Sequence, residues 1–141
     1  MKVKEVLHRI MKISSDTSVA EAARIMSEKL TGSVLVEEDG DVIGIMTERD
    51  MMRKVVAKAK NANQLKVKDI MSTPLITIDA NEDILEASRI MDRHRIRRLI
   101  VVEDGKIIGK VTANSISRNL KYLLARDTSM YSKTEYYGHR E

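Results

Sequence analysis

The hexapeptide EAARIM at residues 21–26 recurs, with one change, as EASRIM at residues 86–91, 65 positions further along the chain. Two further motifs return at the same spacing: EDG (38–40 and 103–105) and IGxxT (43–47 and 108–112). A fixed period shared by several motifs is the sequence signature of a structural repeat. The chain therefore contains two copies of one unit.

The opening segment also repeats, as VKEVL at residues 3–7 and VKDIM at residues 67–71, but here the offset is 64. The second copy thus carries one extra residue, which we place near Pro74. We predict a first domain at residues 1–60, a second at 61–124 and a tail at 125–141. Residues 58–64, where the apolar periodicity lapses, are the expected linker.

Each copy shows the same order of expected elements. Apolar residues at helical spacing predict a helix whose buried face includes Val19, Met26 and Leu30 in the first copy. Asp-Gly between two β-rich runs is a hairpin signal. The expected strands are 10–13, 33–36 and 42–46 in the first copy, then 75–78, 99–102 and 107–111 in the second. With a further helix starting at Thr47 or Thr112, the prediction is an α+β fold, β-α-β-β-α repeated twice.

A single copy of this size buries its sheet and helices poorly. Two copies packed face to face about a pseudo-twofold axis solve that problem and create two related clefts. Clefts between packed units are a common location for small-molecule ligands. We therefore expect a ligand between the two copies.

Composition limits the class of protein. The 141 residues are 43% hydrophobic and 33% charged, and they include no Cys, which excludes disulfides and thiolate metal sites. No apolar run approaches the roughly 20 residues of a membrane span, and the N-terminus lacks the apolar core of a signal peptide. We expect a cytoplasmic protein without membrane contact. The net charge of +4 permits nucleic-acid binding but does not favour it, because acidic residues are spread along the chain.

The stretch from Thr47 to Asp50 supports two interpretations. Thr followed three residues later by an acid, at a helix start, matches a capping box, and spacing alone favours this structural role. Alternatively, Asp50 accepts hydrogen bonds from the vicinal hydroxyls of a ribose. The second copy keeps the threonine, as Thr112, but has Ser115 in place of the acid. We therefore reason that a cap needs only Thr, which leaves Asp50 available for a ligand.

A basic stretch, Arg93–Arg98, precedes the expected strand at 99–102. Its side chains form either a solvated edge, a surface that attracts nucleic acid, or an anion site. Arg97 and Arg98 point to opposite faces of a strand, so we expect one of them to reach the cleft, where a guanidinium suits phosphate. The first copy has Gly32 and Ser33 at these positions, so only one cleft is basic.

Other candidate sites are weaker. Residues 37–41 (EEDGD) suggest calcium but lack the EF-hand spacing, so a hairpin turn is favoured. The histidines His8, His94 and His139 form no metal-binding motif. No catalytic or nucleotide-loop signature is present. We predict that the protein is not an enzyme.

The tandem β-α-β-β-α copies, the Asp-Gly hairpin, the Gly-x-x-Thr-x-x-Asp turn at residues 44–50 and the IRRLIVV run at 96–102 resemble a pair of CBS (cystathionine β-synthase) domains, a Bateman module, over residues 1–124. The resemblance implies a ligand such as AMP, ADP, ATP or S-adenosylmethionine, with or without Mg²⁺, and no required cofactor. It implies that Asp50 holds the ribose, that Thr47 and Arg49 lie near phosphate, and that Arg97 faces Asp50. It further implies that the adenine is flanked by Pro74, Leu75 and Ile76.

The related second cleft would use residues that lack both the ribose carboxylate and the paired arginines, which puts its occupancy by nucleotide in question. These residues are Ile10, Met11, Gly32, Ser33, Thr112, Asn114 and Ser115. The resemblance also implies a homodimer. The tail at 125–141, which contains Tyr131, Tyr136 and Tyr137, would be either disordered or an arm that docks on another subunit.

The sequence thus predicts a regulatory module that senses an adenosine ligand on behalf of an unidentified partner protein. The alternative is a nucleic-acid-binding protein that uses Arg93–Arg98, and it predicts strongly salt-dependent binding. A charge-assisted hydrogen bond contributes roughly 1.5–3 kcal/mol. Asp50 and one or two arginines would therefore supply much of the roughly 8 kcal/mol of a micromolar complex.

Overall fold

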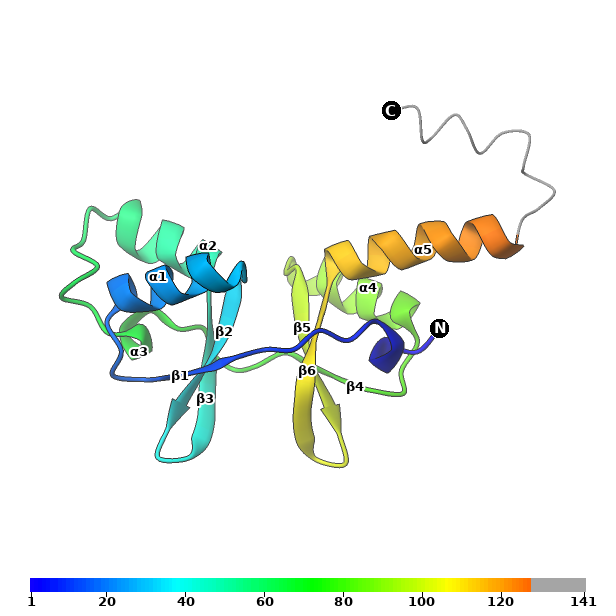
Figure 1. The fold of residues 1–141 in the computed structure, drawn as a ribbon, viewed down its shortest axis with the longest axis horizontal. Helices are drawn as coiled ribbons and strands as arrows, with labels where there is room; N and C mark the ends of the chain where they lie inside the picture. The colour runs from blue at the N-terminus through cyan, green and yellow to red at the C-terminus, as the bar shows by residue number, and fades with distance from the viewer. Residues whose placement is uncertain (128–141) are drawn as a thin grey trace. The chain divides into compact units, whose positions relative to one another are not determined.

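The computed structural model describes residues 1–127, and its element order confirms the repeated α+β pattern (Figure 1). Residues 128–141, with most of the expected tail and its tyrosines, lie outside the described residues. The elements, in chain order, are η1 (Val3–Val6), β1 (Lys12–Ser14), α1 (Val19–Lys29), β2 (Ser33–Glu38), β3 (Asp41–Thr47), α2 (Glu48–Met51), η2 (Met52–Val56), α3 (Val67–Ile70), β4 (Thr77–Asp79), α4 (Ile84–His94), β5 (Arg98–Glu103), β6 (Lys106–Thr112) and α5 (Ala113–Asp127).

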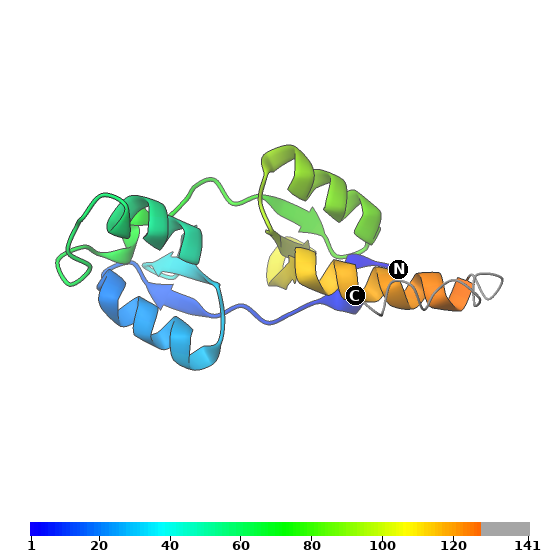
Figure 2. The same cartoon turned by 90° about the horizontal axis from the view of Figure 1, so that it is seen from above.

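The chain divides into two compact units that do not coincide with the sequence copies 1–60 and 61–124. One unit is Arg9–Ile76, and the other combines Met1–His8 with the chain from Thr77 onward. The backbone therefore crosses between units twice, once after His8 and once after Ile76, and both connections are visible in Figure 2. Each unit takes its first short helix from the opposite copy.

Backbone hydrogen bonds explain this exchange. In the Arg9–Ile76 unit, the α3 amide of Val67 donates to the Thr17 carbonyl at 2.8 Å. In the other unit, the η1 amide of Val3 donates to the Glu82 carbonyl at 2.8 Å. Val3 and Val67 are both fully buried, so each short helix closes the core of the unit that receives it.

The two sheets have the same topology. In each, the first strand runs parallel to the second, and the second pairs antiparallel with the third, in the orders β1-β2-β3 and β4-β5-β6. The hairpin turns confirm the Asp-Gly signal, because Asp39 and Gly40 have φ of 52° and 86° and their counterparts Asp104 and Gly105 have 51° and 77°. Two consecutive residues with positive φ are the geometry that a two-residue hairpin loop requires.

The core of the Arg9–Ile76 unit lies between its sheet and its helices. Val34, Val36 and Met46 from the sheet pack with Val19 and Met26 of α1. The prediction that Leu30 continues this apolar face is wrong, since Leu30 is 93% exposed. Leu30 is the cap residue that follows α1, and its left-handed backbone (φ 54°) turns its side chain away from the helical repeat.

Two boundary predictions also need correction. The first strand is Lys12–Ser14 rather than 10–13, and β4 is Thr77–Asp79 rather than 75–78. The parallel pairing covers three residues in each sheet and begins after the apolar residues that were expected to open each strand. The expected linker, residues 58–64, separates the two sequence copies and is part of the Arg9–Ile76 unit, where the Ala62 carbonyl accepts from the Ala20 amide of α1 at 3.0 Å.

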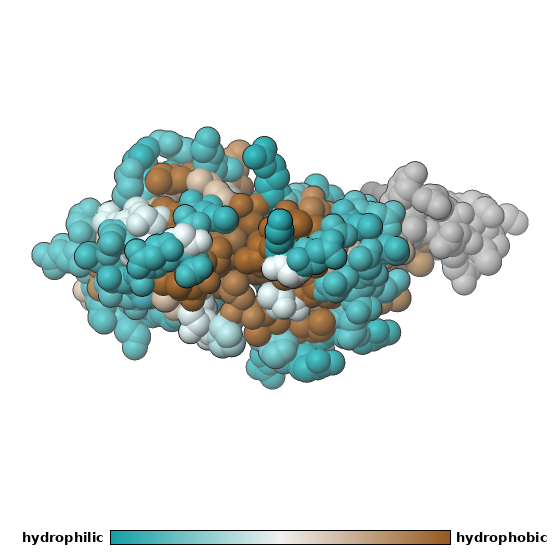
Figure 3. All heavy atoms as spheres, turned by 90° about the horizontal axis from the view of Figure 1, so that it is seen from below, coloured by the Kyte–Doolittle hydropathy of each residue, from teal (hydrophilic) through white to brown (hydrophobic). Residues whose placement is uncertain are grey.

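Hydrophilic residues cover much of the face drawn in Figure 3 (teal), and apolar residues (brown) also reach the surface there. Exposed large apolar side chains among the described residues include Met52 and Val56, one helical turn apart, at 55% and 74% exposure. In the described part of the chain, no helix is both long and apolar enough to cross a bilayer.

Candidate functional site

The predicted site residues Thr47 and Asp50 lie where β3 ends and α2 begins. The Thr47 hydroxyl accepts a hydrogen bond from the Asp50 amide at 3.2 Å, and Asp50 Oδ2 accepts from the Thr47 amide at 3.0 Å. This reciprocal pair is a capping box, which confirms the structural interpretation of the motif. The Thr47 hydroxyl also donates to Asp50 Oδ2 at 3.2 Å.

The second carboxylate oxygen of Asp50 is used as well. Oδ1 accepts from the Ser72 hydroxyl at 2.7 Å and pairs with Lys54 Nζ at 3.0 Å. A carboxylate offers about four lone-pair positions, and donors of the same unit now fill all of them. Asp50 is 6% exposed. The cap uses Asp50 as well as Thr47, so the reasoning that a cap needs only Thr is wrong.

Sequence reasoning did not single out Lys54 or Ser72. Lys54 Nζ donates to the Ile70 carbonyl at 2.9 Å, besides contacting Asp50. Ser72 forms an isolated bridge with Ile45 of β3, with hydrogen bonds of 3.1 and 2.7 Å in the two directions. The spacing of four residues from Asp50 could have indicated Lys54, because such pairs meet on a helix surface. No comparable signal marks Ser72.

Gly44 lets residues 71–73 cross closely over β3. A Cβ at Gly44 would lie 2.8 Å from Met71 Sδ and 3.0 Å from the Ser72 carbonyl oxygen. A larger residue here would push the crossing segment away from β3 and from Asp50. Steric crowding thus explains why the first position of the Gly-x-x-Thr-x-x-Asp motif is a glycine.

The crossing segment leads directly into the predicted adenine-flanking residues. Pro74 is exposed, and Leu75 and Ile76 are half-buried. The structure therefore brings two parts of the predicted site together within the Arg9–Ile76 unit: the turn at Thr47 and Asp50, and the segment 72–76. Arg49, in the first turn of α2, is exposed.

The predicted arginines belong to the other unit. Arg97 is exposed and Arg98, the first residue of β5, is half-buried. The Arg97 carbonyl accepts from the Ala113 amide at 2.8 Å, which places Arg97 beside the start of α5. The same contact occurs in the first copy, where the Gly32 carbonyl accepts from Glu48 at 3.0 Å.

The predicted second-site residues are divided between the units in the same way. The Thr112 amide donates to Ser115 Oγ at 3.1 Å, so the buried Ser115 replaces the acid of the capping box. Asn114 is exposed. The remaining four lie in the Arg9–Ile76 unit, with Ser33 buried and the others half-buried: Ile10, Met11, Gly32 and Ser33.

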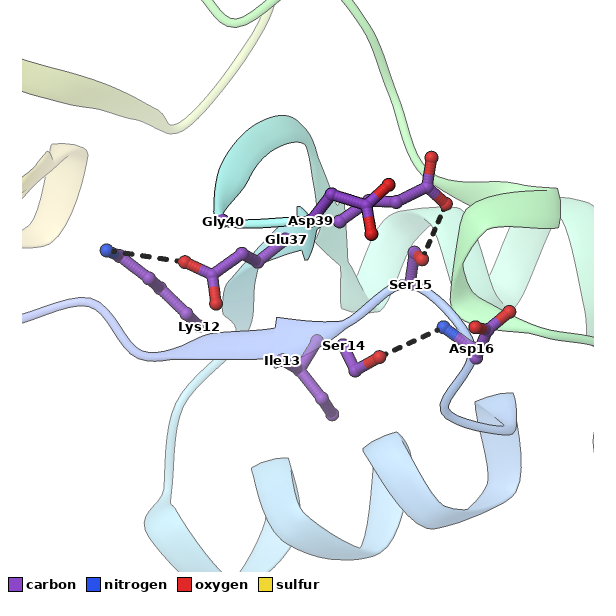
Figure 4. A pocket seen from close by; sticks show the side chains of 9 residues that line it. Lys12, Ile13, Ser14, Ser15, Asp16, Glu37, Asp39 and Gly40 are labelled. Atoms are coloured by element: carbon purple, nitrogen blue, oxygen red, sulfur yellow. Dashed lines mark hydrogen bonds and ion pairs between the residues drawn. The ribbon is translucent and has the colours of Figure 1, made fainter.

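A separate cavity of about 250 Å³ lies between β1 and the β2–β3 hairpin (Figure 4). Three of its four acidic side chains have partners within the same unit: Glu38 accepts from Ser15 at 2.8 Å, Glu37 pairs with Lys12 at 3.6 Å, and Asp16 pairs with Lys68 at 3.3 Å. The Lys68 hydrogen bond is the main cause that lowers the pKa of Asp16.

The calcium interpretation of residues 37–41 gains no support from this cavity. Within residues 1–127, no cluster of three His, Cys, Asp or Glu side chains could hold a metal ion. The segment forms the expected hairpin turn instead.

Comparison with known proteins identifies both copies. A family model described as "CBS domain" matches residues 3–57 and 67–122. A CBS domain-containing protein of Bacillus subtilis, YhcV, is 30% identical over 111 residues, which cover 79% of each chain. An uncharacterised protein of Methanopyrus kandleri is 42% identical over 128 residues, which are 89% of this chain but 65% of that protein. The crystal structure of an uncharacterised conserved protein from Pyrococcus horikoshii is 32% identical, with a TM-score of 0.79 over 84% of this chain and 90% of that one.

Proposed function

Because the chain belongs to the CBS domain family, we propose that it is a regulatory module that binds an adenine nucleotide (AMP, ADP or ATP) or S-adenosylmethionine and signals occupancy to a partner protein. The chain spans less than two thirds of the Methanopyrus relative, so any activity of such a longer protein is also a matter for proposal. The proposal assigns the chain no catalytic step.

One observation carries the proposal. A buried carboxylate, Asp50, lies at hydrogen-bond distance from Ser72, two residues before Pro74. Vicinal ribose hydroxyls are donors that need such an acceptor, and an adenine base needs apolar surface with nearby backbone polar groups. The Thr47–Asp50 turn and residues 72–76 supply these two chemistries within one unit.

Arg97 is the proposed phosphate ligand. Its side chain is exposed at the entrance to β5, and a guanidinium binds phosphate through paired hydrogen bonds. An uncharged nucleoside would not use this contact. Substitution of Arg97 should therefore weaken AMP binding and leave adenosine binding unchanged.

The loss of affinity expected from each substitution can be estimated. Loss of one charge-assisted hydrogen bond costs roughly 1.5–3 kcal/mol, which corresponds to about a 10- to 100-fold loss of affinity. We expect Asp50→Asn to weaken every adenosyl ligand by this factor. Asn119→Ala, a substitution in the second copy outside the predicted site residues, is the control and should leave these affinities unchanged.

Isothermal titration calorimetry of the full chain with AMP, ADP, ATP and S-adenosylmethionine, with and without Mg²⁺, tests the proposal. Saturable binding that Asp50→Asn weakens and Asn119→Ala leaves intact would support it. The absence of heat with every compound, for a protein that circular dichroism shows to be folded, would overturn it. Salt-sensitive binding of random-sequence oligonucleotides in place of adenosyl binding would favour the nucleic-acid function instead.

The homodimer also stays a prediction. Sedimentation equilibrium would check it, and a monomer at micromolar concentration would contradict it.

A further inference from the structure

The carboxylate assigned to ribose is already saturated by the protein's own donors. Thr47 supplies two of them to Oδ2, and Ser72 and Lys54 each supply one to Oδ1. A ribose hydroxyl can bond to Asp50 only after one of these donors leaves. The identity of that donor decides how the site responds to its ligand.

Lys54 is the donor that can leave at the lowest cost. Its side chain is 41% exposed, so water can replace Asp50 as a partner of the ammonium group. It also has a second acceptor in the Ile70 carbonyl at 2.9 Å. The Thr47 amide, by contrast, is fixed by the backbone, and the Ser72 hydroxyl makes the shortest contact to the carboxylate, at 2.7 Å.

We infer that Lys54 is a built-in competitor of the ligand, whose ammonium group occupies the ribose-binding position on Asp50. The inference rests on the proposed function. Ligand binding then moves the ammonium group off Oδ1. Since the same group contacts Ile70 and, at 3.4 Å, the Ser72 hydroxyl, this movement changes the contacts of the segment that leads to Pro74. Occupancy of the site is thereby linked to the position of residues 70–72.

The other copy shows that a CBS unit folds without a lysine paired to a carboxylate at these positions. Ser115 and Asn119 stand at the positions equivalent to Asp50 and Lys54, and the Asn119 side chain donates to the Ser115 carbonyl at 2.6 Å. No carboxylate or ammonium group takes part in that contact. The competition is therefore a property of the Arg9–Ile76 unit, and Asn119 provides a control in the same molecule.

The test compares adenosine binding with stability in Lys54→Met and Asn119→Ala. Adenosine carries no phosphate, so any attraction between Lys54 and phosphate is excluded. Lys54→Met should bind adenosine at least about threefold more tightly, because the ribose no longer displaces a charged donor. The same variant should unfold at a lower urea concentration, because it loses the contacts to Asp50 and Ile70. Asn119→Ala should leave adenosine affinity unchanged.

If Lys54 had only a structural role, Lys54→Met would lower both the stability of the protein and its affinity for adenosine. For 2′-deoxyadenosine, which lacks one of the two hydroxyls, the gain in Lys54→Met should be smaller than for adenosine. Lys54→Gln keeps a donor for the Ile70 carbonyl and serves if Lys54→Met does not fold. If the wild-type protein binds adenosine and neither Lys54 variant binds it more tightly, the inference that Lys54 competes with the ligand is overturned while the proposed function stands. Wild-type protein that binds no adenosyl compound would overturn both.

Discussion

Gly109 of β6 is the position where a single added methyl group should detach the N-terminal segment from its unit. An ideal Cβ there would lie within van der Waals overlap of the His8 carbonyl oxygen, and 2.9 Å from Leu7 Cδ1. The His8 oxygen belongs to the backbone, and His8 and Lys110 exchange hydrogen bonds of 2.8 and 2.9 Å. Gly109→Ala must therefore displace the segment that carries η1.

The loss of folding stability in Gly109→Ala can be estimated from the hydrogen bonds and buried side chains of that segment. The two hydrogen bonds between His8 and Lys110 are worth about 1 kcal/mol each. Val3 is fully buried and Val6 is 6% exposed, and exposure of each would cost a further 1.5–3 kcal/mol or so. We expect Gly109→Ala to lower the free energy of unfolding by about 2 kcal/mol if only the bridge is lost, and by about 5 kcal/mol or more if η1 detaches. Either loss is a large share of the roughly 5–15 kcal/mol that is the typical free energy of unfolding of a small domain.

Gly44→Ala is the matched comparison in the other unit. Its added Cβ would meet first the flexible Met71 Sδ, which can move, and then the Ser72 oxygen at 3.0 Å. The loss should therefore be smaller, about 1 kcal/mol. Urea unfolding followed by circular dichroism measures both variants, and limited proteolysis reports whether Met1–His8 has become accessible. A Gly109→Ala variant within 0.5 kcal/mol or so of wild type, or less destabilised than Gly44→Ala, would refute the steric argument.

Three further predictions follow from the same contacts. Val3→Ala and Val67→Ala should each destabilise the protein by roughly 2 kcal/mol in urea unfolding, since both side chains are fully buried at equivalent positions; a neutral Val3→Ala would contradict the exchange of short helices. The pKa of Asp16, measured by NMR, should lie below its ordinary value of 3.8 and rise toward it in high salt. Any stability from this ion pair is present above the ordinary pKa and lost as the pH falls through the lowered one, so a salt-independent pKa would argue against the pairing. Thr112→Val, which removes the hydroxyl that accepts from the Ser115 amide, should cost about 1 kcal/mol in the same unfolding assay, and an unchanged midpoint would show that this cap is dispensable.

The internal repeat made the fold predictable. Helix faces such as that of Val19 and Met26 and the two Asp-Gly hairpins follow from local periodicity and turn chemistry, which depend on neighbours in sequence. The exchange of η1 and α3 between units could not be derived in this way. It depends on hydrogen bonds such as Val3 to Glu82, which join residues far apart in the chain.

The candidate site was predictable in part. The Gly-x-x-Thr-x-x-Asp motif located the turn, and its capping geometry followed from spacing alone. The saturation of Asp50 did not, because Ser72 reaches it from a segment 22 residues away in the chain. Lys54 was missed for a different reason: a lysine on a helix is usually a solvated surface residue, and only the presence of two acceptors, Asp50 and the Ile70 carbonyl, distinguishes this one.

The exchanged short helices have a consequence for the order in which a ribosome would let this protein assemble. The Arg9–Ile76 unit is continuous in sequence, so it can close as soon as Ile76 has left the exit tunnel. Met1–His8 is synthesised before this unit, yet its partners, in the turn after β4 and in β6, are synthesised after it. Met1–His8 must therefore wait, unpaired, until β6 has been synthesised. A gene cut at the repeat boundary would leave each fragment without the piece that completes it.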